Sequence, residues 1–255
     1  MVVKIISDIH GEYDALSSCL RQSDVAVLLG DYLNLIDFRS LNGILAEVYS
    51  REQIAQALGE IARGRKEYAR SSIRDITGAD PSKQSRVREL ILESYERFFA
   101  CLKCKCLLIY GNTDNPDLMR EVSCGKAEVI ECGVETLDGQ KFGFISGAPC
   151  GPWSVGLPGE MASVEYAKLV SSLGPVDVLC THYPPAISEL TWDTEARRDE
   201  EGSLELLRYI EEYSPERHYF GHVHNPASSS AVHGKTTCIN AGFFKERRTV
   251  LIHRQ

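Results

Sequence analysis

The sequence lacks the features that would place the protein in a membrane or outside the cell. No apolar run approaches the ~20 residues that a helix needs to cross a bilayer. The N-terminal Met-Val-Val-Lys leads directly into an apolar run and leaves no room for a signal peptide. The nine cysteines are odd in number and scattered, unlike the disulfide framework of a secreted domain. We therefore expect a cytoplasmic protein without a membrane partner.

Basic stripes, repeats and low-complexity segments are also missing. The formal net charge is −8, which argues against nucleic acid as a partner. An anionic substrate stays compatible with this charge, because bound divalent cations would reverse the local field. Apolar residues make up 43% and charged residues 25% of the chain. These proportions in 255 residues are typical of a globular protein and predict one large domain, residues 1–255.

Five short apolar runs each stop at a glycine or a proline beside a residue that can bind a metal ion. Such runs are typical of strands buried on both faces. They cover residues 2–6, 25–29, 106–110, 176–181 and 219–220. Helical patterns lie between them, the longest over residues 87–102, with Asp80 and Pro81 as its expected cap and first turn. This alternation predicts an α/β fold, in which the carboxyl ends of parallel strands meet at one edge.

The residues at these strand ends have the chemistry of metal ligands. Asp8 and His10 lie two residues apart, so an extended backbone would point both side chains to the same side. A carboxylate and an imidazole suit zinc or a first-row transition metal. The full set is Asp8, His10, Asp31, Asn112, His182, His222 and His224. Seven ligands exceed the needs of one tetrahedral ion and suit two, and the two oxygens of Asp31 could bridge them.

In this order, the motifs resemble those of the calcineurin-like metallophosphoesterases. The family pattern is D-x-H, G-D, G-N-[H/C]-[D/E], a lone His and G-H-x-H. It is matched along nearly the whole chain by Asp8-Ile9-His10, Gly30-Asp31, Gly111-Asn112-Thr113-Asp114, Thr181-His182 and Gly221-His222-Val223-His224. The resemblance implies two packed β-sheets flanked by helices. It also marks a helical insertion at about residues 39–103, longer than in compact members, which could cap the site or carry a surface for homo-oligomers.

The resemblance also implies a ligand set for each ion and a reaction. One ion would be held by Asp8, His10, Asp31 and His224, and the other by Asp31, Asn112, His182 and His222. Two ions ~3.5–4 Å apart can share a water, lower its pKa and direct it for in-line attack on phosphorus. The expected cofactors are two divalent ions, manganese first, although iron, zinc and nickel accept the same ligands. The expected substrate is a small-molecule phosphate ester.

Two departures from the family pattern bear on the substrate. The segment after Asp31 lacks the arginine of the phosphoprotein phosphatases, which counts against that branch. Thr113 stands where many members have a histidine that assists the leaving group, and an alcohol is a poor general acid near neutral pH. Members with cysteine there include phosphodiesterases, so the resemblance favours a phosphodiesterase. The alternatives are a phosphomonoesterase and a catalytically weak metal-binding scaffold for other proteins.

Further residues have two interpretations each. We expect Asn112 and Asp114 to act in catalysis, although Asp114 could instead cap the helix that starts near Asn115. Thr113 and Tyr183 are expected to contact the substrate, although simple packing is the other interpretation of Tyr183. The remaining residues that could bind metal, substrate or phosphate are expected to be structural or solvated, and they are His218, His233, His253, Cys101, Cys104, Cys106, Trp153, the basic run 63–66 and the acidic run 199–201, which indicates a helix start.

Overall fold

The computed structural model describes residues 2–37, 40–62, 80–123, 125, 127–151, 154 and 156–254. The basic run 63–66, Trp153 and part of the predicted insertion lie outside these ranges.

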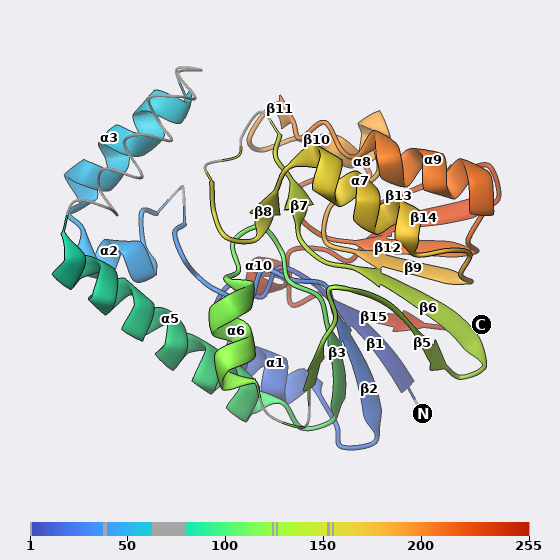
Figure 1. The fold of residues 1–255 in the computed structure, drawn as a ribbon, viewed down its shortest axis with the longest axis horizontal. Helices are drawn as coiled ribbons and strands as arrows, with labels where there is room; N and C mark the ends of the chain where they lie inside the picture. The colour runs from blue at the N-terminus through green and yellow to red at the C-terminus, as the bar shows by residue number, and fades with distance from the viewer. Residues whose placement is uncertain are drawn as a thin grey trace.

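The first sheet has five strands in the order β15-β1-β2-β3-β4 (Figure 1). Four run parallel, namely β1 (Val2–Ile6), β2 (Asp24–Leu28), β3 (Lys105–Leu108) and β4 (Ala127–Val129). The fifth, β15 (Leu251–His253), pairs antiparallel with β1. Three of the five predicted strands therefore lie side by side in this sheet, and their carboxyl ends share one edge.

The second sheet has six strands in the order β13-β14-β12-β9-β6-β5. Its parallel strands are β14 (Thr236–Asn240), β12 (Arg217–Phe220), β9 (Val178–Thr181) and β6 (Gln140–Ile145). Antiparallel strands close both edges, β13 (Ser230–His233) and β5 (Cys132–Leu137). Two small ribbons lie outside the sheets, β7 (Ala148–Pro149) with β8 (Glu160–Met161), and β10 (Trp192–Asp193) with β11 (Arg198–Asp199).

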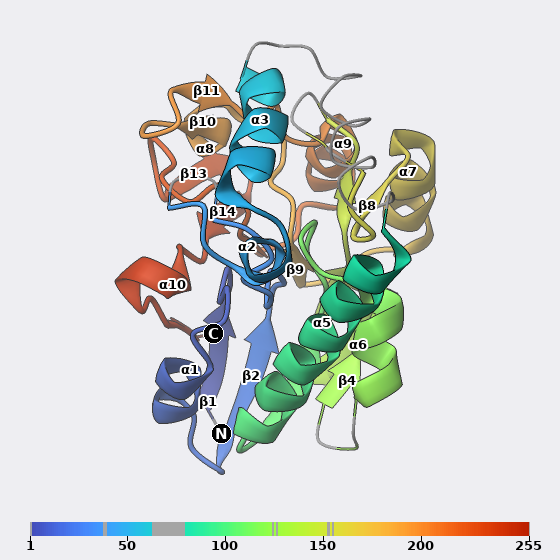
Figure 2. The ribbon, with the colours of Figure 1, turned by 90° about the vertical axis from the view of Figure 1, so that its left-hand side faces the viewer.

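The two sheets pack face to face, with helices on their outer faces. Strand alternation puts Ile5 in the cluster between the sheets, where it packs with residues such as Phe144, and puts Ile6 in the cluster under the helices. The first sheet is covered by α1 (Tyr13–Cys19), α5 (Pro81–Cys101) and α6 (Pro116–Val122). The second is covered by α7 (Ser163–Ser172) and α9 (Leu204–Tyr213). This confirms the predicted α/β fold of two packed sheets flanked by helices (Figures 1 and 2).

The predicted insertion contributes to the body of the domain. Asp80 caps α5 by accepting hydrogen bonds from the backbone of Ser82 and Lys83, as its sequence predicts. Helix α5 buries Tyr95 and Phe98 completely in the cluster of the first sheet. The short helix α2 (Ile44–Val48) packs against α5, and α3 (Arg51–Ala62) stands at one end of the molecule, away from the sheets (Figure 1). The insertion is therefore more than a cap, because its last helix forms part of the core.

Candidate metal centre

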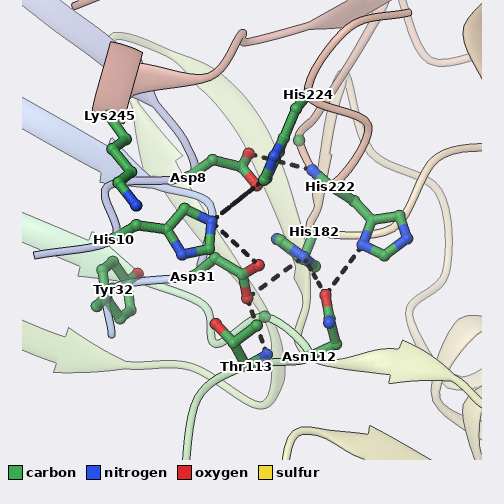
Figure 3. A network of polar contacts seen from close by, with 12 residues as sticks. Asp8, His10, Asp31, Tyr32, Asn112, Thr113, His182, His222, His224 and Lys245 are labelled. Atoms are coloured by element: carbon green, nitrogen blue, oxygen red, sulfur yellow. Dashed lines mark hydrogen bonds and ion pairs between the residues drawn. The ribbon is translucent and has the colours of Figure 1, made fainter. Parts of the chain in front are cut away.

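The seven predicted ligands meet at the carboxyl ends of strands from both sheets (Figure 3). In the first sheet, β1 leads to Asp8 and His10, β2 leads to Asp31, and β3 leads to Asn112. In the second sheet, β9 leads to His182, and β12 leads to His222 and His224. We call these seven residues the ligand cluster. Four of its side chains are almost fully buried, and His224 is 28% exposed. A ligand from solvent would therefore approach on the His224 side.

The backbone of the cluster differs from the extended form expected from the sequence. Strand β1 ends at Ile6, and Asp8 and His10 adopt positive φ values of 57° and 43°. Asp31 and His222 also have positive φ, at 55° and 68°. Each such residue costs about 1–3 kcal/mol, so the surrounding structure must enforce it. Backbone hydrogen bonds from the amide of Asp8 to the carbonyl of Gly30, and from the amide of His10 to the carbonyl of Asp31, hold this conformation. Asp8 and His10 are therefore brought together by a turn and not by an extended strand.

The first group of ligand atoms forms a pocket for one cation. The ligand atoms of Asp8, His10, Asp31 and His224 all lie within 4.8 Å of one another. Nε2 of His10 lies 3.3 Å from Nε2 of His224, which lies 3.2 Å from Oδ1 of Asp8. That oxygen is buried and has no hydrogen-bond partner among the described residues. A buried carboxylate oxygen between two imidazoles fits a bound cation, because it otherwise lacks compensation.

The second group is centred on Asn112. Its Oδ1 lies 2.9 Å from Nε2 of His182 and 2.9 Å from Nδ1 of His222. Asp31 faces both groups with different atoms, since Oδ2 lies 3.7 Å from Nε2 of His10 and Oδ1 lies 3.6 Å from Nε2 of His182. One carboxylate is thus shared between the two sets of ligand atoms. This is the geometry that a bridging ligand requires.

Backbone carbonyls orient two of the imidazoles. Nδ1 of His10 donates to the carbonyl of Leu33 at 3.0 Å, and Nδ1 of His182 donates to that of Leu29 at 2.8 Å. These bonds leave both Nε2 lone pairs directed at the cluster. Burial lowers the pKa of His10 despite the nearby carboxylates, which favours its neutral form. The pKa of Asp8 is also lowered, because the histidines, led by His224, outweigh its burial.

Two motif glycines allow the loops to approach the carboxylates. A Cβ on Gly221 would overlap Oγ of Ser7 and Oδ2 of Asp8. A Cβ on Gly111 would overlap Oδ1 of Asp31. The backbone amide of His222, next to the first of these glycines, donates to Oδ2 of Asp8 at 3.1 Å. The glycines of the G-H-x-H and G-N motifs are therefore required by space at the cluster.

Asp114 lies beneath the cluster and binds backbone. Its carboxylate accepts hydrogen bonds from the amides of Asp31, Tyr32 and Gly111 at 2.8, 3.0 and 2.9 Å. Burial and the neighbouring Asp31 raise the pKa of Asp114 to about 7. The cap of α6 is Asn115, which accepts from the amide of Leu118, so the helix-cap interpretation of Asp114 is wrong. Asp114 holds the Asp31 loop in place, and its importance in catalysis stays a prediction.

The two residues predicted to contact substrate are largely buried. The amide of Thr113 donates to Oδ1 of Asp31 at 3.0 Å, and its hydroxyl is buried without a partner among the described residues. Tyr183 is 5% exposed, donates its hydroxyl to the carbonyl of Glu200, and lies with its ring 4.7 Å from that of His222. These contacts give Tyr183 a packing role beside the cluster. Substrate contact by either residue stays a prediction.

Sequence reasoning missed two side chains at the cluster. Phe243 stacks on His224 with ring centroids 3.8 Å apart and an interplanar angle of 5°, and its ring also meets His10 edge-on. No motif marks Phe243, because it contacts the cluster only through the fold. Glu200 was expected at a helix start, but the cap of α9 is Ser203, and Glu200 is buried beside His222. In the sequence, Glu200 could not be distinguished from the acidic residues on either side of it.

The remaining histidines and the clustered cysteines have structural positions, as expected. The histidine partners are Thr181 for His218, Glu211 for His233 and Gln140 for His253. Burial raises the pKa of the Cys101 thiol to about 11 and that of Cys106 further still, which disfavours the thiolate that zinc requires. Within the described ranges, the first group of the cluster is the one set of three or more His, Cys, Asp or Glu residues whose ligand atoms all lie within 4.8 Å of one another. In the described part of the chain, every helix is too short or too polar to cross a bilayer.

Two packed sheets with carboxylates and imidazoles gathered at their strand ends define an α/β protein with a candidate metal-binding site. The model of the calcineurin-like phosphoesterase family matches residues 1–226, and the chain belongs to that family. This confirms the family resemblance inferred from the motifs.

Solved structures share the fold. A crystal structure that is 19% identical aligns over 100% of this chain and 99% of its own, with a TM-score of 0.63. The crystal structure of TT1561 from Thermus thermophilus is 12% identical, aligns over 99% and 98% of the two chains and has a TM-score of 0.54. At these identities the likeness concerns the fold alone. None of the curated proteins matches the sequence significantly.

Proposed function

We propose that the protein is a phosphoesterase that uses two divalent ions and prefers phosphodiesters. Its family and its ligand cluster make it a metal-dependent phosphoesterase. The observation that carries the two-ion proposal is the position of Asp31, whose two oxygens face separate groups of ligand atoms. One ion would be held by the four residues of the first group. The other would share Asp31 and bind Asn112, His182 and His222.

The donor set fits such ions on chemical grounds. Carboxylate, amide and imidazole donors without thiolates suit manganese, iron, zinc or nickel, and we propose manganese with its preference for oxygen ligands. When bound, the ions would supply an activated water and draw charge from the phosphoryl oxygens. The residues themselves fix the geometry. His10 and His182 hold their protons on Nδ1 and keep Nε2 free for coordination, while Asn112 places one oxygen between two imidazoles.

The preference for diesters is supported by the way the chain uses its histidines. Of the seven histidines, four belong to the ligand cluster and three have the structural partners given above. No imidazole is left among the described residues to protonate a leaving group from the position of Thr113. This arrangement resembles the members of the family with cysteine at that position, which include phosphodiesterases. It favours substrates whose leaving oxygen departs without a strong acid.

A comparison of two chromogenic substrates tests the proposal. The protein would be stripped of metal, reloaded with manganese and assayed on bis-p-nitrophenyl phosphate and p-nitrophenyl phosphate. The proposal predicts faster turnover of the diester. Faster turnover of the monoester would instead support the phosphomonoesterase alternative. Two bound ions without turnover of either ester would favour the scaffold alternative, and failure to bind two ions would refute the proposal.

A further inference from the structure

Glu200 lies beside the ligand cluster without belonging to it. It follows strand β11, and its side chain is only 9% exposed. Its Oε2 lies 3.8 Å from Nε2 of His222, too far for a hydrogen bond but close enough for a strong electrostatic contact. A carboxylate is seldom buried unless a partner compensates it. We therefore expect the buried carboxylate of Glu200 to have a partner that compensates its charge.

His222 presents its two ring nitrogens to different partners. Nδ1 faces the cluster and lies 2.9 Å from Oδ1 of Asn112 (Figure 3). Nε2 faces Glu200. An imidazole that coordinates through Nδ1 must carry its proton on Nε2. A carboxylate on the Nε2 side favours that tautomer and fixes the plane of the ring. Glu200 occupies the position that such a partner requires.

The carboxylate is itself held in place. Oε1 of Glu200 accepts a hydrogen bond from Nε of Arg198 at 2.6 Å. The backbone amide of Glu200 donates to the carbonyl of Thr191, and its carbonyl accepts from the hydroxyl of Tyr183, whose ring packs on His222. Three contacts thus fix Glu200 relative to the ring. Two of them involve only its backbone and would survive a change of the side chain.

The other histidines of the cluster are oriented differently. His10 and His182 donate to backbone carbonyls, and His224 stacks on Phe243. Among the described residues, His222 is the member of the cluster whose outward nitrogen faces a carboxylate from outside it. Glu200 is therefore the carboxylate that can select the tautomer of this ring from its outward side. That role can be tested by substitution.

We propose that Glu200 is a positioning residue for the second ion. Its carboxylate holds His222 in the tautomer and ring plane that direct Nδ1 to the ion, and Arg198 holds the carboxylate. The inference rests on the proposed two-ion function, since His222 belongs to the second group. It assigns Glu200 no contact with the substrate. Its loss should affect the second ion and spare the first.

The test is the binding of manganese to the metal-free protein, followed by calorimetry and by electron paramagnetic resonance of the coupled ion pair. Glu200→Ala should weaken the second ion by about 10–100-fold and leave the first unchanged. Glu200→Gln keeps an acceptor oxygen and should restore part of the affinity. Glu201→Gln, a change at the exposed neighbouring residue, is the matched control and should bind both ions as the wild type does.

The outcomes separate the inference from the proposed function. A wild-type protein that binds fewer than two ions refutes the proposed function. A wild type with two ions and a Glu200→Ala variant with unchanged affinities, or with both ions weakened equally, refutes the inference alone. If Glu200→Ala fails to fold, Glu200→Gln decides. A second ion bound by that variant as tightly as by the wild type would overturn the inference.

Discussion

Replacing Asp31 by asparagine tests the bridging geometry with the least change of shape. The variant keeps an oxygen that can accept from the amide of Thr113, now 3.0 Å from Oδ1. The other oxygen, 3.7 Å from Nε2 of His10, becomes an amide group that cannot coordinate an ion. The substitution also removes one of two carboxylates from the cluster. Asp8, in the first group, is then the one carboxylate left among the seven ligands.

The expected effect follows from the charges. Two divalent ions about 4 Å apart repel each other by about 16 kcal/mol at an effective dielectric constant of about 20. A shared carboxylate about 3 Å from each ion offsets this by about 11 kcal/mol per ion under the same conditions. Without that offset the second ion should not bind at millimolar manganese. Turnover should fall at least about 1,000-fold, because the barrier loses more than about 4 kcal/mol of stabilisation.

Metal content and melting temperature together check this prediction. Calorimetry with manganese should show two ions for the wild type and at most one for Asp31→Asn. The metal-free variant should melt no lower than the wild type, because the charge of Asp31 opposes ionisation of buried Asp114. Asp117→Asn, a change at a side chain that is 94% exposed, is the control and should bind two ions. Two ions and normal turnover in Asp31→Asn would refute the bridging role.

Three further outcomes are expected. Thr113→His should raise turnover of p-nitrophenyl phosphate relative to the diester, and an unchanged ratio would mean that position 113 does not govern the leaving group. Gly221→Ala should lose bound manganese, measured by elemental analysis, because its Cβ would overlap Asp8; full metal content would contradict the packing argument. Burial would raise the pKa of Glu200, but His222 and Arg198 outweigh it and lower the pKa from 4.5 to about 2. The metal-free protein should therefore lose stability as the pH falls from about 5 towards 2, and Glu200→Gln should remove part of that loss in acid-dependent thermal melts.

Much of the fold and of the ligand cluster is predictable because strand ends carry local signals. A buried apolar run followed within a few residues by a metal-binding residue recurs at five places, and all five lead into the cluster. Asp80 and Pro81 mark the start of α5 equally well, since cap and first turn depend on adjacent residues. Information of this kind lies within a few residues of sequence.

Contacts between distant segments could not be read from the sequence. The positive φ of Asp8 and His10 is enforced by hydrogen bonds to the loop after β2, not by their own preferences. Glu200 meets His222, and Phe243 meets His224, only once the strands that precede them have assembled in the fold. An acidic run beside a helix and an isolated phenylalanine have many structural roles. Only the folded chain distinguishes among them.

The cluster combines residues that are synthesised early with residues that are synthesised late. The amide of His222 reaches Asp8 across 214 residues, and every group of ligand atoms includes a residue from the last of the five strand ends. During synthesis the N-terminal ligands leave the ribosome long before these histidines do. If two ions bind as proposed, neither would have its full set of ligands before these histidines are made. Under that proposal, metal loading would follow the synthesis of β12, the strand that leads to His222 and His224.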